Sequence, residues 1–115
     1  MDNVQRAAHR ATASAIIRKL SLRNMTGHYC DTAHEAVALA QSLVAPGQSV
    51  TWGGSVSFTQ SGIKAALEAD GHPMIDRALA TTPEEQEEMW RRQVSADWFF
   101  MGANAITLDG ELVNI

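Results

Sequence analysis

The chain has little of several residue types on which particular classes of protein depend. Its single cysteine, Cys30, can form no internal disulfide and offers no cysteine cluster for zinc or an iron–sulfur centre. One cysteine in 115 residues is typical of a protein in a reducing compartment, so we expect a cytoplasmic protein. The chain also lacks the run of about 18 apolar residues that a membrane helix needs. We therefore expect no membrane partner, and we find no pattern of a signal peptide.

Basic residues and metal-ligand patterns are scarce as well. Nine Lys and Arg residues are outnumbered by thirteen Asp and Glu, which gives a net charge of −4. Nucleic-acid-binding domains are usually basic, so we expect no nucleic-acid partner. None of the four histidines is followed by another histidine four residues later, and no cysteine joins them. We expect no metal site and no bound cofactor.

The composition that remains is that of a globular domain. Apolar residues make up 45% of the chain and charged residues 19%, and the length suits one hydrophobic core. We expect a single α/β domain over residues 1–115, which begins with a basic amphipathic helix at about residues 3–23. Five basic side chains lie in that range against Asp2: Arg6, Arg10, Arg18, Lys19 and Arg23. A solvated helix face explains this charge better than an arm that binds nucleic acid or membrane.

Helix and strand signals alternate along the rest of the chain. A capping box at Thr32 and Glu35 predicts a helix that Pro46 and Gly47 end, and a further helix is expected at about residues 57–69. The run Thr82–Glu85 begins the next helix, with a capping threonine and a proline at the first helical position. Short strands are expected at three places: residues 26–30, 48–52 and 73–75.

The end of the chain predicts two further strand features. Trp98–Met101 is a continuous apolar run, which is typical of a strand buried on both faces of a sheet. Asp109 and Gly110 lie between apolar residues on either side, which predicts a hairpin. The alternation of strands and helices predicts a Rossmann-like layered α/β fold, with a mostly parallel sheet flanked by helices.

In such sheets ligands bind beyond the carboxyl ends of the strands, and the first such place is Gly53, Gly54 and Ser55. Glycines allow positive φ angles and close approach of a ligand to the backbone, so the amides there could hold an anion. Ser55 could add a hydroxyl donor. The alternative is a tight turn in which Ser55 or Ser57 caps the following helix, and the spacing matches no nucleotide-binding motif.

The second such place follows the apolar strand and includes Asn104 and Thr107. A buried asparagine amide must find hydrogen-bond partners, and a ligand carboxylate or carbonyl could provide them. Asn104 could equally tie down its own turn, and for Thr107 a structural role is the better interpretation. No residue of the chain stands out as a general base with a partner, so we name no catalytic residue.

Four segments together resemble the lactate-utilisation (LUD) domain family. They are Val50–Ser55, then Thr59 with Gly62 and Ile63, then Ile75–Arg77, and finally Ala96–Ile115 with its Asn-Ala-Ile-Thr-x-Asp-Gly motif. The glycine pair alone is a weak signal, whereas the order of all four is specific. Gly53, Gly54 and Ser55 match the first loop of the family, and Asn104 and Thr107 match the second.

The resemblance implies a fold related to ribose-phosphate isomerases, glucosamine-phosphate isomerases and CoA transferases. It also implies a part in bacterial systems that oxidise L-lactate to pyruvate, some of which include iron–sulfur partner subunits. Family members continue beyond the point where this chain stops, so the resemblance implies a domain truncated at its C-terminal part. An unfinished sheet edge would pair with another chain, which predicts a homo-oligomer.

Three functions follow from these observations. The first is an accessory protein of lactate utilisation that binds a small organic anion or phosphate at the strand-end loops. The second is a non-catalytic interaction module that docks a partner through its basic helix and its sheet edge. The third is an isomerase-like or CoA transferase-like enzyme whose catalytic residues lie in the missing part, because one scaffold supports many reactions.

Overall fold

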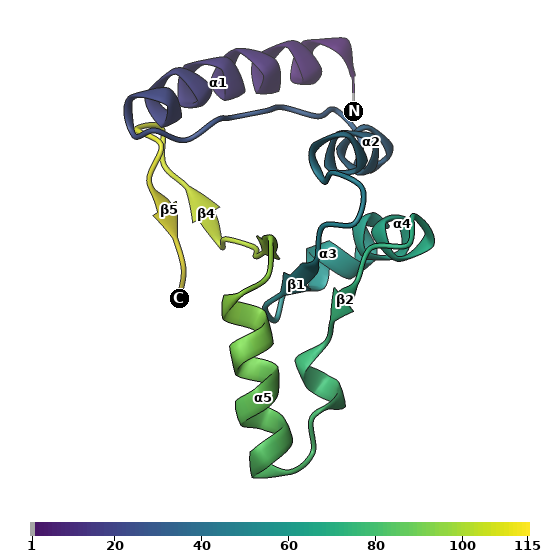
Figure 1. Cartoon of the computed structure of the whole chain (residues 1–115). Coiled ribbons are helices and arrows are strands. Elements are labelled where there is room, and N and C mark those ends of the chain that lie inside the picture. The colour runs from purple at the N-terminus through teal and green to yellow at the C-terminus, as the bar shows by residue number, and fades with distance from the viewer. Residues whose placement is uncertain (1) are drawn as a thin grey trace. The chain divides into compact units, whose positions relative to one another are not determined.

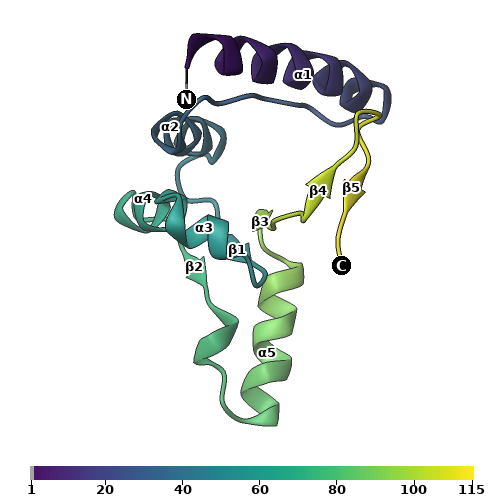
Figure 2. The same ribbon diagram turned by 180° about the vertical axis from the view of Figure 1, so that it is seen from behind.

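Two compact units make up the chain. A computed structural model describes residues 2–115 (Figures 1 and 2). The first unit, which we call the hairpin unit, consists of the residues up to Asp31 together with Ala103–Ile115. The second, which we call the sheet unit, consists of Thr32–Gly102. Each unit is described by itself, and the single domain expected from the sequence stays a prediction.

The hairpin unit begins with helix α1, Asn3–Leu22, close to the predicted range. The Asp2 carboxylate caps it by accepting a hydrogen bond of 2.8 Å from the Gln5 amide. No glycine or proline interrupts its residues, and Asn24 follows it with a left-handed φ of 59°. None of the residues of α1 is buried, so the cap and the helix propensity of its residues account for the helix better than core packing does.

The strand predicted at residues 26–30 is wrong. This segment forms no strand and instead runs back along α1, as both views show (Figures 1 and 2). A Cβ atom at Gly27 would lie 2.8 Å from Cγ1 of Ile17, so the backbone passes directly over the helix. The segment packs on helix α1 and pairs with no described strand. Its short apolar pattern is compatible with either neighbour, so the sequence could not distinguish packing on a helix from pairing with a strand.

The predicted hairpin is confirmed. Strands β4, Ala105–Ile106, and β5, Leu112–Val113, pair antiparallel. Gly110 adopts a φ of 81° in the turn, and a Cβ atom there would lie 3.2 Å from the backbone nitrogen of Leu20. Glycine is needed for both reasons, because a side chain would be strained by the backbone angle and crowded by α1.

The sheet unit contains a parallel three-stranded sheet in the order β2–β1–β3. Its strands are β1 (Val50–Trp52), β2 (Met74–Ile75) and β3 (Trp98–Phe100). Helix α2 (Ala33–Leu43) precedes β1. Helical segments connect the strands, as parallel pairing requires. They are α3 (Val56–Gln60) and α4 (Ile63–Ala69) between β1 and β2, and the 3-10 turn η1 (Arg77–Leu79) and α5 (Pro83–Val94) between β2 and β3. The predicted α/β architecture with a parallel sheet flanked by helices is therefore confirmed.

The helix predicted at about residues 57–69 is divided in two. Gly62 lies between α3 and α4 with a φ of 91°, which is the left-handed conformation that glycine tolerates best. Both halves carry apolar residues at helical spacing, so a prediction from periodicity alone merged the two helices into one. The predicted starts at Thr32 and Thr82 are correct, because the hydroxyl of each threonine accepts a hydrogen bond from the amide three residues later.

Alternation along β1 places the hydrophobic core on one face of the sheet. Val50 and Trp52 point to one side, as side chains two residues apart in a strand do. There Val50 joins Val44, Phe58 and Leu67 in the buried cluster. An aromatic row extends it: ring centroids lie 5.5 Å apart for Trp52 and Phe58, 4.9 Å for Phe58 and Phe100, and 6.2 Å for Phe100 and Trp98.

Thr51 points to the opposite face, toward α5. It is completely buried, and its hydroxyl donates to the Ile75 carbonyl at 2.9 Å and accepts from Nε2 of Gln93 at 3.0 Å. This hydroxyl joins β1 to the neighbouring strand and to α5 at once.

The expectation that Trp98–Met101 is buried on both faces is wrong. Trp98 and Phe100 pack against the core, whereas Phe99 is 55% exposed and Met101 is also exposed. The strand lies at the edge of the sheet, and α5 leaves its second face uncovered in the described part of the chain. A continuous apolar run therefore does not by itself distinguish a central strand from an edge strand.

We predict that Thr51→Val lowers the free energy of unfolding by about 1–3 kcal/mol, because the buried Gln93 contact loses its acceptor. Urea denaturation monitored by circular dichroism measures the change. Thr59→Val, at an exposed position of α3, is the matched control, and its effect should stay within about 0.5 kcal/mol. Equal effects of the two substitutions would show that the Thr51 hydroxyl does not stabilise the sheet.

Candidate functional site

The predicted site residues belong to different units. Gly53, Gly54 and Ser55 directly follow β1 in the sheet unit, whereas Asn104 and Thr107 lie in the hairpin unit. Because the five residues are divided between the two units, a pocket shared by all of them stays a prediction.

Gly53 is held by the sheet. Its amide donates a hydrogen bond of 3.0 Å to the Phe100 carbonyl, which extends the β1–β3 pairing by one residue. A Cβ atom at Gly53 would lie 3.6 Å from the Phe99 ring, an ordinary packing distance. The positive φ angles predicted for Gly53 and Gly54 are wrong, because neither residue is among the left-handed glycines.

The loop is open from Gly54 onward. No atom lies within 4 Å of the position that a Cβ atom of Gly54 would occupy. The amides of Gly54 and Ser55 have no hydrogen-bond partner within residues 2–115. Ser55 Oγ accepts from the Phe58 amide at 3.3 Å, so this serine is the helix cap that the alternative interpretation predicted. Accepting that bond leaves the hydroxyl hydrogen available to a ligand.

The end of β3 approaches this loop at Gly102. A Cβ atom at Gly102 would lie 3.1 Å from Ser55 Oγ, so only a glycine fits without displacing the hydroxyl. The carboxyl ends of β1 and β3 therefore meet, as parallel pairing of neighbouring strands requires. Sequence reasoning placed Gly102 at the start of the second candidate segment but gave it no role, because its contact with Ser55 depends on the strand order.

A positive charge lies beside the last residue of β1. Lys64 of α4 places its Nζ 4.9 Å from the centroid of the Trp52 ring, a cation–π distance. Among the described residues Lys64 forms no ion pair. Its charge is therefore not neutralised within the sheet unit, and it favours an anion near the loop. Helical periodicity placed neighbouring Ile63 in the core but gave no signal for the contact between Lys64 and Trp52.

Asn104 and Thr107 hold the hairpin together. Asn104 Oδ1 accepts from the Ile115 amide at 2.8 Å, and the Asn104 amide donates to Val113 at 2.9 Å. Thr107 Oγ1 accepts from the Glu111 amide at 2.9 Å. Thr107 thus makes a contact within the turn, whereas Asn104 joins the two ends of the hairpin and does not tie down its own turn. A ligand role for either residue stays a prediction.

Side chains with displaced pKa values lie elsewhere. A hydrogen bond from Arg10 lowers the pKa of Asp31, and the pKa of neighbouring Tyr29 is raised by desolvation and by the Asp31 charge. Backbone hydrogen bonds at the start of α5 lower the pKa of Glu85. These displacements follow from structural contacts and assign no general acid or base to the Gly53–Ser55 loop.

The described histidines and acids also gather in no metal-binding group. Within residues 2–115 no three His, Cys, Asp or Glu side chains are placed to hold a metal ion. His72 is buried, and its Nδ1 lies 3.1 Å from the Gln48 carbonyl, which is a structural contact. None of the helices in this part of the chain has both the length and the apolar character that crossing a membrane requires.

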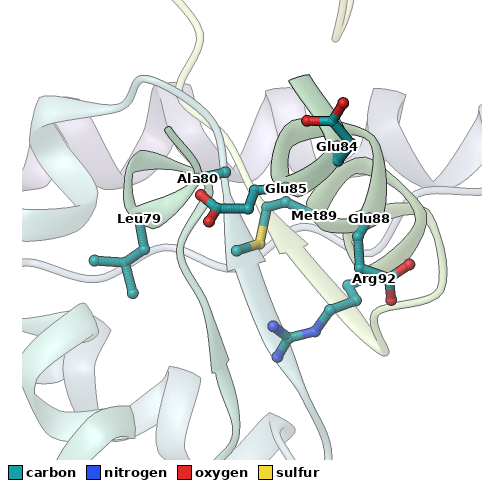
Figure 3. A pocket seen from close by; sticks show the side chains of 7 residues that line it. All are labelled: Leu79, Ala80, Glu84, Glu85, Glu88, Met89 and Arg92. Carbon is teal, nitrogen blue, oxygen red and sulfur yellow. The ribbon is translucent and has the colours of Figure 1, made fainter. Parts of the chain in front are cut away.

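A groove of about 370 Å³ lies between α5 and the segment that follows η1 (Figure 3). Met89 and Leu79 supply its apolar part, and three glutamates, Glu84, Glu85 and Glu88, line it beside one arginine. This excess of negative charge disfavours an organic anion. The loop after β1 is therefore the better candidate for the anion predicted from the sequence.

Comparison with known proteins identifies the family. The search of curated proteins and the search of solved structures each found no match to the chain. A family model described as the LUD domain matches residues 13–115, which is most of the sequence and includes both candidate loops. The chain therefore belongs to the LUD domain family, which is associated with lactate utilisation.

Proposed function

We propose that the chain binds a small organic anion of the lactate and pyruvate class at the Gly53–Ser55 loop, as an accessory component of bacterial lactate utilisation. Membership of the LUD family supports the metabolic setting. The observation that carries the proposal is the pair of unpartnered amides at Gly54 and Ser55 at the end of β1, where the space beside Gly54 is open.

The donors of the loop match the groups of a hydroxy acid. The Gly54 and Ser55 amides would donate to the carboxylate, and the Ser55 hydroxyl would donate to the 2-hydroxyl or 2-oxo oxygen. Hydrogen bonds to a charged group are stronger than those between neutral groups. A ligand of so few atoms buries little surface in an open loop. We therefore expect a Kd of about 1 mM, which corresponds to a binding free energy of about −4 kcal/mol.

Electron transfer would require a partner. With one cysteine among its 115 residues, the chain has no cluster of thiolates for an iron–sulfur centre. Any such centre in a lactate-oxidising system would lie on a partner subunit, and this chain would present or sense the organic acid. The same scarcity of cysteine favours a reducing, cytoplasmic setting.

Replacing Gly54 by valine should abolish binding without unfolding the protein. The new side chain enters open space and covers the two free amides. We expect the affinity for L-lactate to fall at least about tenfold. The measurement is a titration followed by the amide chemical shifts of Ser55 and its neighbours, at constant ionic strength with sodium chloride as reference.

Gly53→Ala is the matched control, because the Gly53 amide already bonds to Phe100 and the added methyl group meets only ordinary contacts. Its affinity should stay within about twofold of the natural chain. If Gly54→Val binds L-lactate as well as the natural chain does, the loop is only a turn.

Lys64 should contribute through its charge. Lys64→Gln should weaken lactate binding several-fold and reduce its dependence on salt, whereas Lys64→Arg should preserve both, because Arg keeps the charge and the contact with Trp52. Titrations at low and high ionic strength measure these effects. Equal affinities of the Gln and Arg variants would exclude Lys64 from the site.

A second candidate function is a non-catalytic interaction module. Four large apolar side chains on α5, on β3 and directly after β3 are exposed in the sheet unit: Trp90, Val94, Phe99 and Met101. Single exposed apolar residues are common, but four on neighbouring elements favour an interface.

If the chain is an interaction module, it should self-associate as its concentration rises. Phe99→Asn should then shift the equilibrium to the monomer, because it removes an apolar ring from the exposed surface. Sedimentation equilibrium measures the shift, with Leu22→Asn on exposed α1 as the control. A natural chain that stays monomeric over the whole range excludes self-association as its function.

A further inference from the structure

A second groove beside α5 shares Ala80 and Met89 with the acidic groove but has the opposite charge character. Its volume is about 370 Å³, within the usual range of ligand sites. It is lined by Arg77 of η1 and by Gln86, Met89, Trp90 and Gln93 of α5, together with two alanines. No acidic side chain lines it, so its one charge is the arginine cation.

Helical spacing explains why this side of α5 is free of acids. Gln86, Met89, Trp90 and Gln93 stand at i, i+3, i+4 and i+7, and therefore form one stripe. The glutamates lie off this stripe: three line the first groove, and Glu87 forms an ion pair with Arg91 at 2.7 Å. The stripe offers an indole, a thioether and two amides without a competing negative charge.

A contact with the sheet positions Gln93, and the start of η1 places Arg77. The Gln93 amide donates to the buried Thr51 hydroxyl, which leaves its carbonyl oxygen free. Arg77 directly follows Asp76, whose carboxylate caps η1 by accepting from the Ala78 amide at 3.0 Å. Arg77 forms no ion pair with any described residue, so its guanidinium is available.

We propose that this groove binds an anion attached to a planar ring. Arg77 would bind the carboxylate or phosphate, which match its planar fork, and the exposed indole of Trp90 would stack on the ring. The Gln86 and Gln93 amides would bond to polar atoms at the ring edge, and Met89 would form the apolar floor. A nucleoside monophosphate and an aromatic carboxylate share this chemistry. The site is separate from the Gly53–Ser55 loop and does not depend on the function proposed for it.

The test titrates the full chain with adenosine monophosphate, indole-3-acetate and ribose 5-phosphate, and follows binding by calorimetry and by saturation-transfer NMR. We expect at least one of the two ring compounds to bind, and ribose 5-phosphate, which lacks an aromatic ring, to bind at least about tenfold more weakly. Preference for the nucleotide or for the carboxylate identifies the source of the ligand. Ribose 5-phosphate binding as tightly as the ring compounds, or neither ring compound binding, overturns the proposal.

Variants assign the binding to the groove. Arg77→Gln and Trp90→Ala each change an exposed side chain, so folding should persist, and each should weaken binding at least about tenfold. Arg92→Gln removes the same charge from the other side of α5 and should have less than about a twofold effect. Gly54→Val should leave ring-compound binding unchanged. Equal loss in Arg77→Gln and Arg92→Gln would indicate general charge attraction and overturn the assignment.

Discussion

The sheet unit depends on the alternation of three residues in β1. Val50 and Trp52 face the core, and Thr51 faces α5, so one short strand joins both layers. A shift of the strand by one residue would place Thr51 among the aromatic rings and turn Val50 toward α5, which would deprive Gln93 of its hydrogen-bond acceptor. The Thr51 hydroxyl opposes such a shift, because in the present register it satisfies the Ile75 carbonyl and the Gln93 amide together. Register, core and helix position are therefore set by the same three side chains.

This constraint also positions the two candidate binding sites. The carboxyl end of β1 leads directly into Gly54 and Ser55, and its pairing with β3 brings Gly102 against the serine hydroxyl. On the other face of the sheet, the hydrogen bond between Thr51 and Gln93 holds α5 beside η1, which begins at Arg77. One site consists mainly of backbone amides and the other of side chains on a helix. They differ in kind because one lies at a strand end and the other between a turn and a helix.

Features set by neighbouring residues could be predicted from the sequence. The caps at Thr32 and Thr82 and the Asp109–Gly110 turn depend on residues close in the chain, and all three were correct. The strand at residues 26–30 and the burial of Phe99 depended on distant neighbours, and both predictions were wrong.

The candidate site follows the same division. Gly54 and Ser55 were found because glycines after a strand mark a strand end, a local pattern. The approach of Gly102 to Ser55 and that of Lys64 to Trp52 required the strand order and the helix packing. Neither can be obtained from spacing along the chain.

The donors at the loop after β1 favour recognition over reaction. The Gly54 and Ser55 amides are neutral, and they exchange water for a ligand without any change in protonation. Lys64 adds a charge that attracts anions, whereas the side chains with displaced pKa values belong to structural contacts at Asp31, Tyr29 and Glu85. With such donors, the ligand proposed above would be held by the fit of its oxygens and would be released readily. Such exchange would suit the proposed role of a subunit that presents or senses an organic acid for chemistry performed by a partner.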